Sequence, residues 1–107
     1  MEERENFFIV RPSGYLDDAG GKQLLAFFEV PFKKGIKKQI LNLSGTPVIN
    51  SQGITHILEL VETILYDQKA QLALVGLSEL YVDVFQVVGI LKMIKLFPNE
   101  ETALKEF

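Results

Sequence analysis

The apolar residues of the chain fall into two patterns, short continuous runs and longer stripes with helical spacing. Continuous runs at residues 7–10, 39–43 and 72–75 are rich in leucine, β-branched and phenylalanine side chains, which predicts buried strands. The clearest stripe lies between the second and third runs and predicts an amphipathic helix at about residues 53–66. Its apolar positions recur with the spacing of one helix face and are Ile54, Ile57, Leu58, Val61, Ile64 and Leu65.

Capping residues and breakers place the other helices. Asp17 or Asp18 is suited to begin a helix, because acidic side chains stabilise a helix N-terminus, and Pro31 is expected to end it. Ser78 is suited to cap a further helix at residues 78–88.

The order of these elements predicts the fold class. A last short strand is expected at residues 93–97, followed by a terminal helix. Strands and helices therefore alternate along the whole chain, which is typical of an α/β fold with parallel strands. We expect a single domain over residues 1–107, with a mostly parallel central sheet of about four or five strands and about four helices.

The composition narrows the classes of function. The chain carries 11 Lys and Arg against 14 Asp and Glu, a formal net charge of −3, so charge alone does not suit it to bind nucleic acid. It has no cysteine, which excludes disulfides and thiolate sites, and its single histidine, His56, excludes sites that need two. The acidic start does not look like a secretory signal, and no apolar stretch is long enough to insert across a membrane. We expect a cytoplasmic protein without a cofactor.

His56 is the one side chain with an obvious general-base chemistry. With Ile54 at the centre of the buried helix face, His56 points about 160° away from that face, so we expect it to be exposed. Ser51 would be its nucleophile, but five helical positions leave the two side chains about 140° out of alignment. The pair gives little support to a hydrolase. A surface histidine without a special role and a contact with a partner both stay open.

The segment Asn50-Ser51-Gln52-Gly53 lies where a connection ends and a helix begins. A serine at such a junction can cap the free amides of the first helical turn with its hydroxyl. The same amides and the helix dipole would also stabilise a phosphate on Ser51. The residue types therefore leave two roles open, a structural cap and a phosphorylation switch.

Several motifs, taken in order, resemble the STAS domain family of bacterial anti-sigma factor antagonists over essentially the whole chain. In the strongest stretch, residues 40–45 and 50–54, the family has an apolar strand, Ser-Gly, and then Asp-Ser-Ser-Gly-Leu at the start of a helix. Shorter likenesses lie at residues 14–17, 74–78, 88–90 and 96–104. The joint order and spacing of these motifs carry the resemblance.

The resemblance implies a small α/β domain that acts by binding and not by catalysis. A typical member is phosphorylated on the first Ser of Asp-Ser-Ser-Gly by an anti-sigma factor that is also a Ser/Thr kinase. Its unphosphorylated form binds that partner and so frees a sigma factor for transcription. Ser51 occupies the position of the phosphoacceptor, and a phosphatase and a homodimer are further partners that the family admits. The expected partner-binding surface consists of Asn50, Gln52, Gly53, Thr55, His56 and Glu59.

Two departures from the family pattern favour a second hypothesis. Asn50 replaces the usual Asp and Gln52 the second Ser, which removes a negative charge and a hydroxyl. A STAS subunit that is not phosphorylated would act as a scaffold or as an accessory subunit of a lipid-transport ATPase complex. Leu80, Val82 and Val87 fit such a permanent interface, and they fit extra core contacts equally well. A small enzyme is the third hypothesis, and the lack of a second His, a Cys or a convincing carboxylate pair speaks against it.

Overall fold

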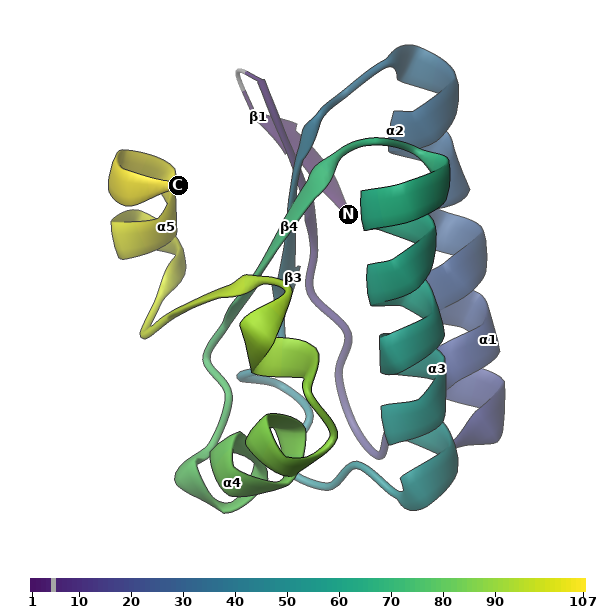
Figure 1. Ribbon diagram of the computed structural model, residues 1–107, viewed down its shortest axis with the longest axis vertical. Helices are drawn as coiled ribbons and strands as arrows, with labels where there is room; N and C mark the ends of the chain where they lie inside the picture. Colours follow the sequence, from purple (N-terminus) through teal and green to yellow (C-terminus); the bar gives the residue numbers. More distant parts are fainter. Residues whose placement is uncertain (5) are drawn as a thin grey trace.

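One five-stranded sheet organises the computed structural model, which describes residues 1–4 and 6–107 (Figure 1). Glu5 lies outside the described residues. The strand order is β1-β2-β3-β4-β5, and every neighbouring pair except β1 with β2 is parallel. The predicted α/β fold with a mostly parallel sheet is confirmed. The four predicted strands lie within two residues of their expected bounds, and the first strand, at residues 2–4, was not predicted. The strands are β1 (Glu2–Arg4), β2 (Phe7–Val10), β3 (Lys38–Asn42), β4 (Gln71–Val75) and β5 (Lys95–Phe97).

Helices cover both faces of the sheet. α1 (Asp18–Phe27) and α3 (Ser51–Glu62) lie side by side against one face, and α5 (Glu100–Glu106) packs on the other (Figure 1). α2 (Glu29–Lys34) follows α1, and α4 (Glu79–Val87) follows β4. None of the helices in the described part of the chain has the length and apolar character that a membrane span requires.

The apolar core has two parts, one on each face of the sheet. Successive residues of β2 alternate between them, because neighbouring side chains of a strand point to opposite faces. The strands read as continuous apolar runs because both faces are covered by helices. The larger part, beneath α1 and α3, includes Phe8, Val10, Leu24, Leu41, Ile57, Leu60, Ile64 and Leu74. The smaller part, beneath α5, includes Phe7, Ile9, Ile40, Val75 and Ala103.

The sequence predicts that Pro31 ends the first helix, and this prediction is wrong. The chain breaks at Phe28 and begins α2, in which Pro31 is the third residue. At this position of a first helical turn a proline loses no hydrogen bond, because the missing N–H would have had no partner within the helix. α2 ends at Gly35, whose φ of 72° lies in the left-handed region that favours glycine.

An ion pair fastens α5 to the carboxyl ends of two strands. The Arg11 guanidinium, just after β2, binds both carboxylate oxygens of Glu100 at 2.7 and 2.8 Å. The side-chain amide of Asn42, the last residue of β3, donates to the same carboxylate at 2.5 Å. Arg11, and then Asn42, hold the pKa of Glu100 below its usual value against the opposing effect of burial.

Glu100→Gln is therefore expected to lower the free energy of unfolding by about 1–2 kcal/mol at neutral pH. A lowered folded-state pKa contributes stability above the unfolded-state value of 4.5, and that stability is lost as the pH falls through the folded-state value. The difference between wild type and variant should accordingly shrink below pH 4.5. Urea unfolding across this pH range measures it, with exposed Glu101→Gln as the control. A difference that stays constant with pH would contradict the assignment.

Candidate functional site

The connection between β3 and α3 is fastened to the connection between β2 and α1. Leu16 forms a parallel bridge with Ile49. The amide of Leu16 donates to the carbonyl of Val48 at 2.9 Å, and the amide of Asn50 donates to the carbonyl of Leu16 at 3.0 Å. We call this pairing of Leu16 with residues 48–50 the backbone clasp. It fixes the chain immediately before Ser51, so α1 and α3 begin next to each other.

Tyr81 of α4 supports the same connection from a third direction. Its hydroxyl oxygen accepts a hydrogen bond from the amide of Ile49 at 2.9 Å. The turn that leads to Ser51 is thus held by the loop before α1 and by α4 together. Sequence analysis missed Leu16 and Tyr81, because both act through partners that are distant in the sequence.

Asn50, and not Ser51, caps α3. Asn50 has extended backbone angles, and its Oδ1 accepts a hydrogen bond from the amide of Gly53 at 2.8 Å. Ser51 is the first residue of the helix and is exposed. The prediction of an exposed serine is confirmed, and the prediction that its hydroxyl caps the helix is wrong. An Asn at this position satisfies the free amide as well as the Asp it replaces, so the cap does not depend on the missing charge.

Gly53 is buried against the backbone clasp. A Cβ atom on this residue would lie 2.5 Å from the carbonyl oxygen of Leu16. Only glycine therefore lets the first turn of α3 approach the clasp this closely. Gly53 was expected at the partner-binding surface, but its place in the structure is between α3 and the loop before α1.

The exposed part of the predicted surface consists of Ser51, Gln52, Thr55 and Glu59. These residues lie along the outer side of the first turns of α3. The hydroxyl of Thr55 donates to the carbonyl of Ser51 at 2.9 Å, so its polar group is partly used inside the helix. Their contact with a partner stays a prediction.

His56 is not exposed, contrary to the sequence prediction. Its side chain is only 12% exposed and lies between α3 and α1, over Gly21. Its Nε2 is 2.7 Å from Oδ1 of Asp18 on α1. The helical-wheel argument failed because α3 buries one face against the sheet and a second against α1. The signal that could have found this contact is Gly21, a glycine inside a predicted helix.

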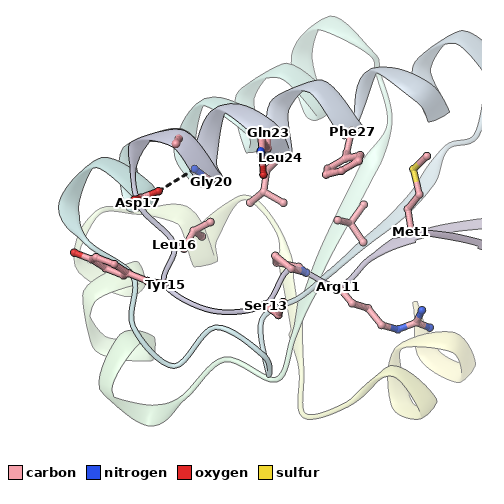
Figure 2. Close-up of a pocket in the computed structure, with 13 residues that line it drawn as sticks. Met1, Arg11, Ser13, Tyr15, Leu16, Asp17, Gly20, Gln23, Leu24 and Phe27 are labelled. Carbon is pink, nitrogen blue, oxygen red and sulfur yellow. Dashed lines mark hydrogen bonds between the residues drawn. The ribbon is translucent and has the colours of Figure 1, made fainter.

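A hollow of about 440 Å³ lies on the other side of α1, next to the backbone clasp (Figure 2). Leu16, Leu24 and Phe27 line its wall, and Asp17 caps α1 at its end by accepting a hydrogen bond from the amide of Gly20 at 2.9 Å. Arg11 borders the hollow but is engaged by Glu100. No histidine lines it. The carboxylate of Asp17 in this lining is engaged by the α1 backbone.

Asn50→Ala is expected to lower the free energy of unfolding by about 1 kcal/mol, because it leaves the amide of Gly53 without its acceptor. Ser51→Ala is expected to change it by less than about 0.5 kcal/mol, because the Ser51 side chain is exposed. Urea unfolding of both variants measures the difference. A larger cost for Ser51→Ala than for Asn50→Ala would show that the serine is the cap after all.

Gly21→Ala is expected to lower the free energy of unfolding by about 1–3 kcal/mol, because the new Cβ would lie 2.5 Å from the imidazole of His56. In a His56→Ala background the same change should become neutral or stabilise by up to about 1 kcal/mol, since alanine favours a helix over glycine. A double-mutant cycle measures the coupling. Equal effects of Gly21→Ala in both backgrounds would rule out the close contact.

Comparison with known proteins identifies the fold and the family. The model of the STAS domain family matches residues 1–103. No curated protein matches the chain.

Several solved structures share the whole fold. A candidate anti-sigma factor antagonist from Thermotoga maritima superposes with a TM-score of 0.84 and 21% identity over 98% of this chain and 90% of its own. SpoIIAA, the Bacillus cell fate determinant, in its phosphorylated form superposes with a TM-score of 0.74. Its sequence identity is 20%, and the match covers 98% of this chain and 94% of SpoIIAA. The STAS domain of a SulP transporter from Vibrio cholerae superposes with a TM-score of 0.74 and 16% sequence identity. The match covers 96% of this chain and 81% of that domain. Sequence identities this low show the fold alone. The family model, in contrast, spans nearly the whole chain, and on that match the protein belongs to the STAS domain family.

Proposed function

We propose that the protein is an anti-sigma factor antagonist that is switched by phosphorylation of Ser51. The observation that carries the proposal is the geometry of this serine. Ser51 is exposed at the first position of α3, on a turn that is fixed by the Asn50 cap and the backbone clasp. A kinase would therefore meet a hydroxyl presented by a rigid scaffold, next to the exposed side chains of Gln52 and Thr55.

A phosphate on Ser51 would change the surface more than the fold. It would add about −1.5 to −2 charges at the N-terminus of α3, where the helix dipole favours negative charge. Within the domain the phosphate is thus tolerated. At an interface fitted to a neutral hydroxyl, it would add repulsion and leave desolvated groups unpaired, which weakens binding. The unphosphorylated protein would bind an anti-sigma factor kinase and free the sigma factor, and a phosphatase would restore that form.

Comparison of folds supports this proposal. The Bacillus neighbour is known in unphosphorylated and phosphorylated forms, and both share the fold of this chain. The domain therefore belongs to a fold that accommodates a phosphate. Members of the family act as binding modules, and no group of side chains suited to hold a metal ion occurs among the described residues.

The second hypothesis, a STAS subunit that is not phosphorylated, is favoured by one surface. Leu80 and Val87 of α4 are 71% and 87% exposed, and Val84 and Val88 are exposed as well. A group of exposed apolar side chains on one helix is typical of an interaction surface. The departures at Asn50 and Gln52 point the same way, as does the likeness to a transporter STAS domain. A scaffold or an accessory subunit of a lipid-transport ATPase complex would use this surface continuously.

The deciding experiment mixes the protein with an anti-sigma factor kinase encoded next to it and ATP, and maps phosphate by mass spectrometry. We expect phosphate on Ser51, none in Ser51→Ala, and unchanged labelling in the matched control Ser78→Ala, whose serine is also exposed at a helix start. Ser51→Asp should weaken kinase binding by roughly 1–3 kcal/mol, measured by calorimetry.

Asn50→Asp is the companion variant, because it restores the family's acidic residue while keeping the cap. It should raise phosphorylation of Ser51 if the missing charge makes this chain a poor substrate. Phosphate at another residue with Ser51 unmodified would refute the proposed site. No phosphorylation together with tight binding to a transporter ATPase would establish the second hypothesis instead.

A further inference from the structure

The imidazole of His56 lies between two carboxylates on two different helices. Its Nε2 is 2.7 Å from Oδ1 of Asp18 on α1, and its Nδ1 is 3.4 Å from Oε1 of Glu59 on α3. Lys22 of α1 is on the far side of Asp18, where its Nζ is 3.2 Å from the other carboxylate oxygen. These are the charged groups that face the ring from both helices among the described residues.

The two ring nitrogens are satisfied unequally. The contact between Nε2 and Asp18 is a short hydrogen bond, whereas Nδ1 is buried and has no hydrogen-bond partner among the described residues. A neutral imidazole has one N–H and one lone pair. When that N–H donates to Asp18, the lone pair on Nδ1 faces the Glu59 carboxylate. An imidazolium has two N–H donors, one for each carboxylate, so the arrangement fits the protonated ring better than the neutral one.

The ring has little freedom to leave this position. Its Cδ2 atom is 2.5 Å from the place where a Cβ of Gly21 would lie, so the imidazole packs directly on the α1 backbone. The hydrogen bond with His56, and then that with Lys22, lowers the pKa of Asp18, so this carboxylate stays charged at neutral and mildly acidic pH. His56 is one turn beyond Gln52 on α3, so its contact with α1 follows the first turn of the helix, which begins at Ser51.

We propose that His56 is a positioning residue for the Ser51 turn and that proton uptake by its imidazole tightens the contact between α1 and α3. The added Nδ1–H donates to Glu59, and the imidazolium then joins both carboxylates. Partner recognition at Ser51 becomes pH-dependent through a group that the partner does not touch. The part that concerns Ser51 rests on the proposed function, and the tightening itself does not.

Amide hydrogen exchange tests the tightening directly. The experiment compares the protection factors of residues 54–60 at about pH 5.5 and about pH 7.5, which lie on either side of the pKa of an unperturbed imidazole. A protection factor divides out the intrinsic exchange rate, so values at different pH can be compared. Wild type should be protected roughly tenfold more at the lower pH, the effect of a hydrogen bond to a charged group. In Glu59→Gln the side-chain amide can donate to the neutral Nδ1, so the pH effect should shrink to the part that Asp18 carries. Glu62→Gln, the same change on an exposed residue of α3, should retain it.

Equal wild-type protection at both pH values, or a Glu59→Gln variant that keeps the full effect, would overturn the proposal. A functional arm compares the rate of Ser51 phosphorylation in wild type and Asp18→Asn at the same two pH values. The ratio of the wild-type rate to the Asp18→Asn rate should be about threefold higher at the lower pH than at the higher pH, because a more firmly held turn is a better-positioned substrate. Asp67→Asn, the same change at a different aspartate, is the control for this comparison of rates. If no kinase modifies Ser51, the proposed function fails, and the exchange experiment still decides whether His56 acts as described.

Discussion

The structure depends on one close approach, that of the first turn of α3 to the backbone of Leu16. The carbonyl oxygen of Leu16 lies 2.5 Å from where a Cβ of residue 53 would be, and only glycine permits this approach. The two hydrogen bonds of the backbone clasp, one of them accepted by this same oxygen, complete the contact. Because α1 and α3 begin near this contact, it fixes the relative position of their first turns. The exposed serine at the start of α3 inherits that rigidity.

The same closeness explains the behaviour of the side chains between the two helices. At this contact between α1 and α3 a small residue on one helix makes room for a flat ring on the other. Gly21 supplies the small residue and His56 the ring. A polar ring in such a place needs partners, and Asp18 and Glu59 provide them from the two helices. The polar contact is thus a consequence of close packing, and it links α1 to α3 near the candidate site.

The carboxyl end of the sheet joins the parts that a partner would meet. The clasp, the α3 N-terminus and the start of α4 all lie beyond the ends of β2, β3 and β4, and Tyr81 connects two of them through the amide of Ile49. Parallel strands bring their connections to one edge in this way, which is why α/β domains gather their binding residues there. The exposed apolar residues of α4 lie on a helix that begins at this same end. A switching protein and a permanent subunit could therefore share the fold and differ only in which side chains fill this end.

The amino-acid sequence by itself determined the four parallel strands, the long helix, the alternating order and the exposed position of Ser51, but not the antiparallel first strand. These features rest on local periodicity and on turn residues, which act over a few positions. The tertiary structure decided what depends on distant partners. It placed Asn50 as the cap, because the backbone clasp fixes the chain up to Asn50 and the helix begins at the next residue, Ser51. It also turned His56 inward, because Gly21, 35 positions earlier by sequence number, leaves space for the ring. A helical wheel assumes one buried face, and α3 has two, one against the sheet and one against α1.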